Sequence, residues 1–101
     1  MIFGNDGKHF INSGNGIIRN SAGGQDIWNR GITHRTNGTA TTSGGITHFG
    51  NKSITKSGNT YYCNGHSYSL TNSILYGPNG KNWVGVHTDH EVRSIIMSNE
   101  D

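Results

Sequence analysis

The sequence is poor in the residues that build large hydrophobic cores and disulfide frameworks. Its 101 residues include a single cysteine, Cys63, so no disulfide can form within the chain. Isoleucine, leucine, valine and phenylalanine together number only 19, and no apolar run approaches the ~18 residues of a membrane-spanning helix. The first residues lack the basic and apolar regions of a signal peptide. These absences predict a soluble cytoplasmic protein with a thin core and no membrane association, with assembly into a larger particle as the alternative.

Charge is also sparse, and it is unevenly distributed. Residues 1–86 carry seven basic and two acidic side chains, whereas residues 87–101 carry one basic and four acidic side chains. The formal net charge is only +2, which is too low for the charge-driven disorder that a hydrophobic-poor composition would otherwise suggest. We therefore expect one folded domain over residues 1–101, with a mildly basic body at 1–86 and an acidic tail at 87–101. No window contains a run of bases, so a polyanion-binding surface is not required.

Turn-forming and small polar residues make up much of the chain, which has 16 Gly, 13 Asn, 10 Ser and 10 Thr. Such residues favour turns and exposed strand faces over helices. An aromatic ring followed by a small residue and an Asn/Gly turn occurs four times, beginning at Phe3, Phe49, Tyr62 and Tyr76, and Gly-Ile-Thr-His occurs at both 31–34 and 45–48. The spacing indicates a unit of 13 to 14 residues.

This rhythm predicts an all-β fold of short antiparallel hairpins, arranged as a meander or small sandwich, with a compact β-solenoid as the competing geometry. We expect one inward position per unit, on a 14-residue grid formed by Ile18, Ile32, Ile46, Thr60 and Ile74. Because the core is thin, self-association that buries further surface is also predicted.

The end of the chain has helical rather than strand character. Thr88 and Glu91 match a capping box, and Val92, Ile95 and Ile96 follow at helical spacing. The pattern predicts one short C-terminal helix over about residues 89–98. Its apolar stripe is expected to cover the open end of the β body, or else to contact a second copy of the chain.

Residues able to carry chemistry are present, but they do not form a recognisable catalytic pattern. His87 and His90 flank the start of the predicted helix and are weak candidates for a metal site, since a structural zinc usually needs four identifiable ligands. Cys63 fills the slot of Gly50 and Gly77 in neighbouring units, which predicts a small, partly buried residue. We therefore expect no catalytic residue, no bound metal and no cofactor.

Rings and cations are the candidate binding residues. Aromatic side chains near basic ones can stack on sugars or nucleic-acid bases, or can anchor a protein interface. The alternative is that the rings of successive units stack inside the body. The residues predicted to bind are Trp28, Arg30, Arg35, Lys52, Lys56, Tyr61 and Lys81.

The repeat rhythm resembles Gly/Asn-rich short-repeat proteins met in bacteria and their phages. The missing catalytic constellation and the Arg, Tyr and Trp content predict a non-enzymatic binding module. We expect a small phage or mobile-element accessory protein that occludes or bridges a macromolecular partner, a protein first of all, such as a host defence complex that it inhibits. The alternatives are a structural or receptor-binding piece of a phage fibre or spike that binds glycans, and a nucleic-acid-binding protein with a basic β face.

Overall fold

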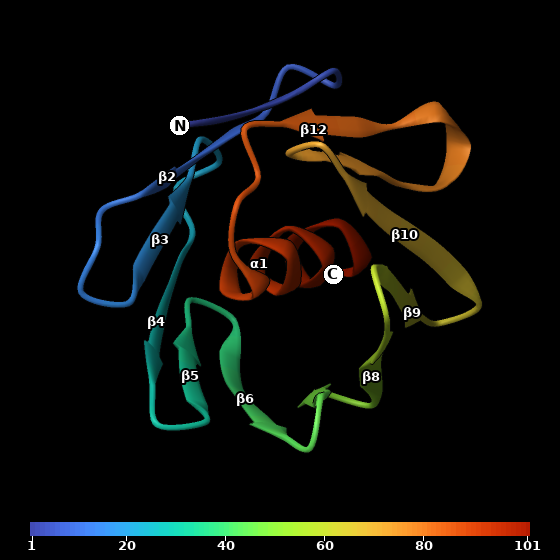
Figure 1. The fold of residues 1–101 in the computed structure, drawn as a ribbon. Coiled ribbons are helices and arrows are strands. Elements are labelled where there is room, and N and C mark those ends of the chain that lie inside the picture. Colours follow the sequence, from blue (N-terminus) through green and yellow to red (C-terminus); the bar gives the residue numbers. More distant parts are fainter.

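Twelve short antiparallel strands form a closed ring around one helix in the computed structural model, which describes residues 1–101 (Figure 1). The helix, α1 (Asp89–Glu100), follows all the strands in sequence, and a 3-10 turn at Pro78–Gly80 joins the last two. The strands are β1 (Ile2–Gly4), β2 (His9–Asn12), β3 (Ile17–Asn20), β4 (Gln25–Asn29), β5 (Ile32–Arg35), β6 (Gly38–Ser43), β7 (Ile46–Phe49), β8 (Lys52–Ser57), β9 (Thr60–Cys63), β10 (His66–Thr71), β11 (Ile74–Tyr76) and β12 (Asn82–Val84).

The predicted repeat is confirmed as a hairpin of two strands and their turns. Several turns are two residues long and place both residues at positive φ, as at Gly44 (62°) and Gly45 (81°), or at Asn64 (55°) and Gly65 (80°). Two-residue turns of this kind have the twist of paired antiparallel strands, and glycine and asparagine adopt positive φ with little strain. The Gly/Asn-rich composition is therefore explained by the number of hairpins.

The hairpin turns alternate between the two rims of the barrel. The turns β1–β2, β3–β4, β5–β6, β7–β8, β9–β10 and β11–β12 share one rim, which we call the helix-end rim because α1 finishes there. All four copies of the aromatic-small-Asn pattern lie at this rim. The remaining turns form the opposite rim, the helix-start rim, where the chain leaves β12 and enters α1. The repeat in the sequence thus marks one edge of the barrel.

The ring is closed by pairing between the first and last strands, and the prediction of a meander, sandwich or solenoid is therefore wrong. β1 pairs with β12 through Phe3 opposite Val84 and Gly4 opposite Trp83, and it pairs with β2 on its other side. Every strand consequently has two neighbours. Closure removes the edge strands that an open sheet would expose to other chains.

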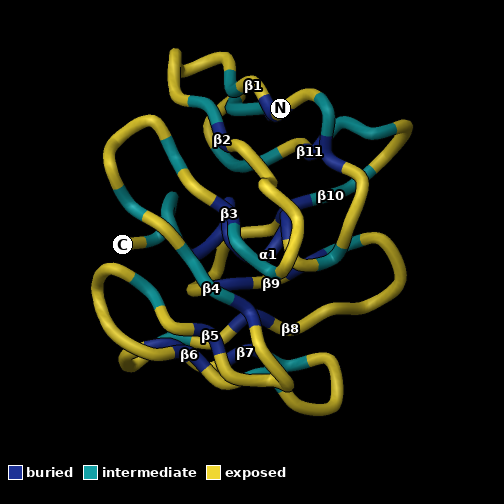
Figure 2. The backbone as a smooth tube through the Cα atoms, turned by 90° about the vertical axis from the view of Figure 1, so that its left-hand side faces the viewer, coloured by how far each residue is buried: buried dark blue, intermediate teal, exposed yellow.

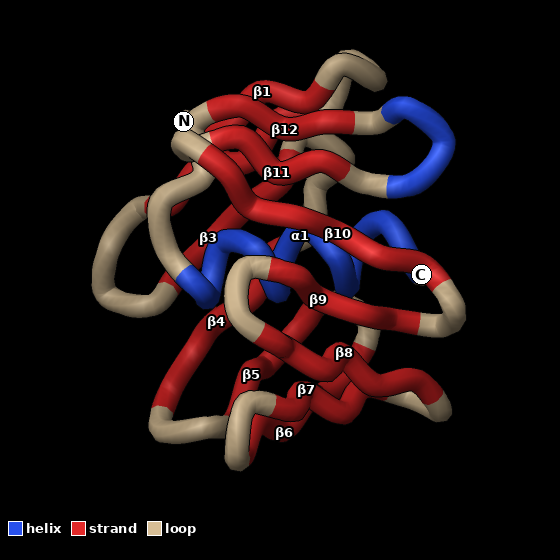
Figure 3. Tube along the Cα trace, turned by 45° about the vertical axis from the view of Figure 1, so that its right-hand side comes forward, coloured by secondary structure: helices blue, strands red, loops and turns tan.

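α1 lies inside the ring rather than across one end of it, as Figures 1 and 3 show. Twelve strands spaced ~4.8 Å apart give a ring about 18 Å across even before tilting, which is too wide for side chains alone to fill. A helix is ~10–12 Å across with its side chains and occupies this space. Seven consecutive helical residues, Glu91 to Met97, are buried on every side. The capping box at Thr88 and Glu91 is confirmed, but the predicted placement over an open end is wrong.

The inward positions lie one residue beyond the predicted 14-residue grid. Ile18 faces the core, but Ile32 is 45% exposed, and Ile46, Thr60 and Ile74 are only partly buried. A one-residue shift along a strand moves every side chain to the other face of the sheet. The buried grid consists of Thr33, Thr47, Tyr61 and Leu75, which are 0–1% exposed. Figure 2 shows the buried residues along the inner wall and the exposed residues at the turns.

Cys63 shares its slot in the repeat with Gly77, as predicted, but not with Gly50. Fourteen residues away on either side lie Phe49 and Gly77, whereas Gly50 belongs to a turn. Cys63 is fully buried, at 1% exposure. Gly77 makes room for the large ring of Trp83, since a Cβ at Gly77 would lie 2.7 Å from Trp83 Cζ3. The inner wall is therefore matched in size, with small residues beside large rings.

Candidate functional site

Polar residues inside the helix-start rim form a hydrogen-bonded network around Arg93. This side chain is 1% exposed, and it donates from Nε to Asp89 Oδ2 at 2.7 Å, from Nη1 to Thr47 Oγ1 at 2.7 Å and from Nη2 to the Gly45 carbonyl at 2.9 Å. The Tyr61 hydroxyl donates to the other oxygen of Asp89, also at 2.7 Å. Buried charges are stabilising only when they are paired in this way. The cluster therefore anchors the helix and leaves no free group for chemistry.

The acidic residues at this rim are held in their ionised form. Burial alone would raise the pKa of Asp89, but the hydrogen bonds from Arg93 and Tyr61 and the charges of Arg93 and Lys56 lower it. Burial would likewise raise the pKa of Glu91, but hydrogen bonds from the His87 and Thr88 amides and from Asn12 lower it. Both carboxylates also lie in the first turn of α1, where the helix dipole favours negative charge.

The helix-end rim has the opposite arrangement. Glu100 and Asp101 lie at the C-terminal end of α1, where the helix dipole disfavours negative charge, and the last turn contains no basic residue. The compensating cations, Arg35 and Lys52, come from the barrel wall instead. Arg35 Nη2 donates to Asp101 Oδ2 at 2.6 Å, and Lys52 Nζ donates to the Glu100 carbonyl. The Glu100 side chain has hydrogen-bond partners on the wall as well, with His66 Nδ1 2.9 Å from Oε2.

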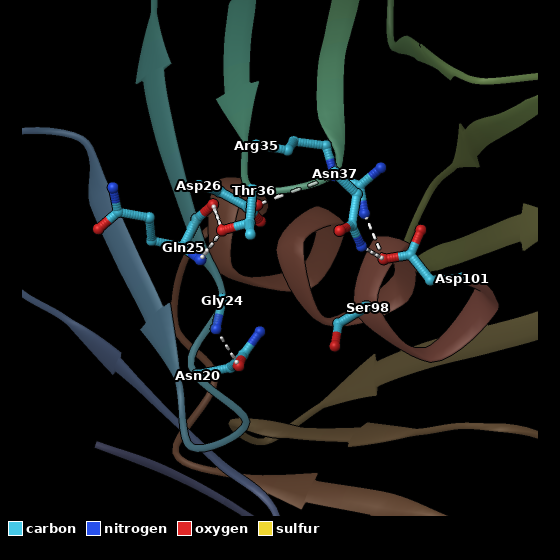
Figure 4. Close-up of a pocket in the computed structure, with 9 residues that line it drawn as sticks. All are labelled: Asn20, Gly24, Gln25, Asp26, Arg35, Thr36, Asn37, Ser98 and Asp101. Carbon is cyan, nitrogen blue, oxygen red and sulfur yellow. Dashed lines mark hydrogen bonds and ion pairs between the residues drawn. The ribbon is translucent and has the colours of Figure 1, made fainter.

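Two adjoining cavities flank the contact between Arg35 and Asp101. The smaller, about 30 Å³, is lined by polar residues of β3, β4, the β5–β6 turn and the end of α1 (Figure 4). The larger, about 290 Å³, lies between the β5–β6 and β7–β8 turns and includes Phe49 and Lys52 in its lining. Arg35, Asn37 and Asp101 line both cavities. In Figure 4 the side chains of Asn37 and Asp101 point toward one another.

All six carboxyl side chains are used within the molecule, and this leaves the outer surface basic. Asp6 lies 4.0 Å from Lys81 and Asp26 lies 3.8 Å from Arg35, while the four carboxylates of the tail have the partners described above. In contrast, Lys8 and Arg30 have no side-chain partner, and Arg19 contacts only the neutral Gln25. The unpaired charges on the outer wall are therefore all positive.

A cluster of exposed apolar side chains lies on the outer wall where the ring closes, across β2, β1, β12 and β11. Figure 3 shows β1, β12 and β11 side by side. Phe3 lies opposite Val84, and Val84 lies opposite Ile74 in the ladder, so the three share the outer face. We call this surface the closing patch. Its members and their exposed fractions are Phe3 (58%), Val84 (49%), Tyr76 (48%) and Ile11 (42%), together with the partly buried Ile74.

Basic side chains border the closing patch. Arg19 lies directly opposite Ile11 in the β2–β3 ladder, His9 lies opposite Phe3, and Lys8 precedes β2. No acidic side chain belongs to the outer face of these strands. Apolar residues with a charged border are the usual anatomy of a protein-binding surface.

Two of the predicted binding residues lie inside the barrel. Trp28 is 7% exposed, stacks on His90 with ring centroids 4.4 Å apart, and donates from Nε1 to Ser94 Oγ at 2.9 Å. Tyr61 is 1% exposed. Both rings contact the helix. Their position agrees with the alternative expectation, in which the rings pack inside the body.

The predicted basic residues are divided between the two rims. Arg35 and Lys52 are brought together at the larger cavity, and Lys81 lies at the same rim with its Nζ donating to Asn99. Lys56 lies at the helix-start rim, 3.7 Å from Asp89, and Arg30 occupies an exposed turn there. The structure thus assembles one pair of the predicted cations and separates the others.

The weak metal candidates are not brought together. His90 stacks on Trp28, whereas His87 Nδ1 lies 3.2 Å from Ser73 Oγ. No three His, Cys, Asp or Glu side chains are close enough to share an ion. Burial, reinforced by Glu100, raises the pKa of the Cys63 thiol to about 11, against a smaller opposing effect of Lys52. The thiol is therefore protonated near neutral pH, which disfavours a role as nucleophile.

The closing patch is the feature that sequence reasoning missed. Its signal is present, since the outward positions of β6, β8 and β10 are Ser and Thr, whereas those of β1, β11 and β12 include Phe, Ile, Tyr and Val. This difference becomes visible only when the inward and outward positions are assigned correctly.

Comparison with protein-family models, with characterised proteins and with solved structures finds no match. The one α-helix, of 12 residues, falls short of the length and apolar character needed to cross a membrane.

Proposed function

We propose that this chain is a non-enzymatic binding module that contacts a protein partner through the closing patch. The observation that carries the proposal is the grouping of Phe3, Val84 and Tyr76 on one outer face at about half exposure each. Exposed apolar clusters of this kind are costly in water and typically mark interaction sites. Large aromatic anchors also contribute most of the binding energy in protein interfaces.

The charge around the patch favours an acidic partner over a second copy of the chain. Lys8 and Arg19 border the patch without a carboxylate partner. A symmetric dimer through this face would bring unpaired cations together, because every carboxylate of the chain is already used internally. A partner with an apolar site and an acidic border would instead pair with these cations and be steered towards them.

The proposal is compatible with the predicted role as a phage or mobile-element accessory protein that occludes a host complex, which stays a prediction. Under this proposal the closing patch is the face through which occlusion would occur. A closed barrel with a helix inside is a rigid support, so little ordering of the chain is needed on binding.

The test uses a patch variant and a matched control on another part of the outer wall. The patch variant is Phe3→Ser with Val84→Thr, and the control is Ile32→Thr with Tyr62→Ser, where the exposed fractions are 45% and 50%. Wild type, patch variant and control are used for affinity capture from host lysate, and the captured protein is then purified and its Kd measured. We expect the control to bind within about threefold of wild type and the patch variant to bind at least about tenfold more weakly.

Charge provides a second readout with the same purified partner. Reversal at Arg19→Glu is expected to slow association and to reduce its dependence on salt. Equal loss in the patch and control variants would contradict the proposal. So would a wild-type dimer that only the patch variant dissociates, because the patch would then be a contact between copies.

A further inference from the structure

The larger cavity at the helix-end rim contains two cations held against one aromatic ring. The Arg35 guanidinium carbon lies 5.2 Å from the centroid of Phe49, and Lys52 Nζ lies 6.0 Å from it. Phe49 itself is 3% exposed. The Phe49 ring forms the part of the cavity wall between the two cations, and the cation–π contacts hold both side chains near this ring.

Arg35 has hydrogen-bonding capacity that the fold does not use. Its side chain is only 8% exposed, yet its buried Nε makes no hydrogen bond, and the nearest Asp26 oxygen is 3.8 Å away. Buried polar groups are nearly always satisfied, so an unsatisfied guanidinium nitrogen beside a cavity requires an explanation. A guanidinium is also the side chain best suited to bind a planar or tetrahedral oxyanion through two donors.

The carboxylate at the end of the helix that contacts this cation pair is that of Asp101, and it contacts Arg35 alone, whereas Lys52 donates to the Glu100 carbonyl. Arg35 Nη2 donates to Asp101 at 2.6 Å and Asn37 Nδ2 at 3.3 Å. The exposed fractions of Asp101 and of Asp89 at the other rim are similar, 33% and 38%. The helix dipole opposes Asp101 and favours Asp89, so displacing Asp101 into water should cost less than displacing Asp89.

We propose that this cavity is a binding site for a phosphate group, and that the Asp101 carboxylate is the internal group that such a ligand displaces. The remaining lining of Asn37, Thr39 and Asn51 supplies amide and hydroxyl donors around the two cations. A phosphate monoester presents several acceptor oxygens and nearly two negative charges near neutral pH, which match this donor set better than a single carboxylate does. The site is separate from the closing patch, and it does not depend on the proposed protein partner.

The size of the cavity limits the ligand. Its volume of about 290 Å³ lies at the lower end of the range for ligand pockets, ~300–1,000 Å³. It can hold inorganic phosphate or the phosphate and sugar of a nucleoside monophosphate. The two sources share one chemistry, and separate titrations distinguish them.

The experiment is a titration of isotope-labelled protein with inorganic phosphate and, separately, with adenosine monophosphate, followed by NMR of the Asn37 and Asn51 side-chain amides. The wild-type protein is expected to show saturable shifts at these amides. Asp101→Asn removes the competing charge and should tighten binding by about tenfold, whereas Lys52→Gln should weaken it by about tenfold or more. Arg30→Asn removes a cation at the opposite rim, at a positive-φ position that asparagine tolerates, and should leave the affinity unchanged.

The Asp101→Asn variant keeps the test decisive even if a cation variant is destabilised, because a gain in affinity cannot arise from unfolding. Tighter binding of adenosine monophosphate than of phosphate would identify the nucleotide as the source, and equal binding would identify the free anion. Absence of saturable shifts at Asn37 and Asn51 would overturn the proposal. Failure of Asp101→Asn to tighten binding, or an equal loss with Arg30→Asn, would also overturn it.

Discussion

The two rims of the barrel hold the two ends of one helix, and the helix dipole has opposite effects on the carboxylates at the two rims. At the helix-start rim, Asp89 and Glu91 lie where the helix dipole favours them, and backbone amides, Arg93 and Tyr61 complete their hydrogen bonds. At the helix-end rim, Glu100 and Asp101 lie where the dipole opposes them. Their stabilisation depends on cations that the barrel wall supplies.

This difference indicates that the contacts at the helix-start rim are needed for the fold, whereas those at the helix-end rim can be replaced. Neither cavity lies at the helix-start rim, and each of the three guanidinium nitrogens of Arg93 donates one hydrogen bond. The helix-end rim has two cavities and an unused donor on Arg35. Removing a group from the first rim should therefore damage the fold, whereas removing a group from the second should mainly change what the rim can bind.

The largest expected effect is that of Arg93→Met. The substitution leaves the Asp89 carboxylate without its nearest cation and leaves Thr47 Oγ1 and the Gly45 carbonyl without the donors that Arg93 provided. Breaking a fully buried ion pair typically lowers the free energy of unfolding by ~3–5 kcal/mol, and because Asp89 is 38% exposed and keeps Lys56 and Tyr61 as partners, we expect a loss of about 2–3 kcal/mol here. The matched change at the other rim, Lys81→Gln, removes a half-exposed cation and should cost less than ~1 kcal/mol.

Denaturant unfolding of both variants measures this contrast. A comparable loss of stability in Arg93→Met and Lys81→Gln would show that the two rims do not differ in the way that their hydrogen bonding indicates.

An intermediate effect is expected from the same substitution made at each end of the helix. Glu91→Gln replaces a carboxylate that accepts from the His87 amide, the Thr88 amide and Asn12, and it should lower the free energy of unfolding by about 1 kcal/mol. Glu100→Gln also removes a negative charge, but from the unfavourable end of the dipole. The Glu100 side chain is only 4% exposed and accepts from the Tyr68 hydroxyl, a bond that the glutamine oxygen can keep, so the loss of stability should be smaller than at Glu91. Thermal unfolding of the pair at neutral pH, with circular dichroism at low salt, tests the difference. If Glu100→Gln proved the more damaging of the two, the dipole argument would be wrong.

The smallest effect is a difference in pH dependence. The pKa values of Asp89 and Glu91 are lowered in the folded state, so their stabilisation is present above the unfolded-state values of 3.8 and 4.5 and is lost as pH falls through the folded-state values. Asp26, beside the helix-end rim, behaves oppositely. Its burial raises the pKa above 3.8, against the opposing effects of Ser94 and Arg35, so its ionisation costs stability as pH rises through that region.

Unfolding midpoints measured from pH 3 to pH 7 should therefore respond differently to two variants. Asp26→Asn is expected to remove the cost that appears above pH ~4, while Glu91→Gln should weaken the loss of stability in acid. An unchanged pH profile for Asp26→Asn would indicate that burial does not raise the pKa of this group.

The local features of the fold were predictable from the sequence, but its closure was not. Turn chemistry and the capping box at Thr88 depend on neighbouring residues, and both predictions are confirmed. Closure depends on pairing β1 with β12, about 80 residues apart, and on a helix that fills the ring. The prediction that the isoleucines of the 14-residue grid point inward was wrong, because large apolar side chains do not identify the inner face of the strands in this fold. Close to the helix the wall needs small residues such as Thr33 and Thr47, while Ile32 faces outward.

The candidate sites were only partly predictable for the same reason. Arg35 and Lys52 were identified as cations, but their position beside one cavity follows from the hairpin register. Trp28 and Tyr61 are residue types that are common in binding sites, but in this fold they are core residues. The closing patch requires knowledge of which strands meet when the ring closes.

The position of α1 inside the ring links docking of the helix to closure of the barrel. Without the helix the closed ring would enclose unfilled space, so docking of α1 and pairing of β1 with β12 are expected to stabilise each other. The hairpins are local and can form early, whereas closure joins residues from opposite ends of the chain and only two pairs, Phe3 with Val84 and Gly4 with Trp83. The step that completes the barrel is therefore the least local one, and its ladder is one of the two shortest. It also brings the apolar residues of the closing patch together, so that this surface exists only on chains that have finished folding.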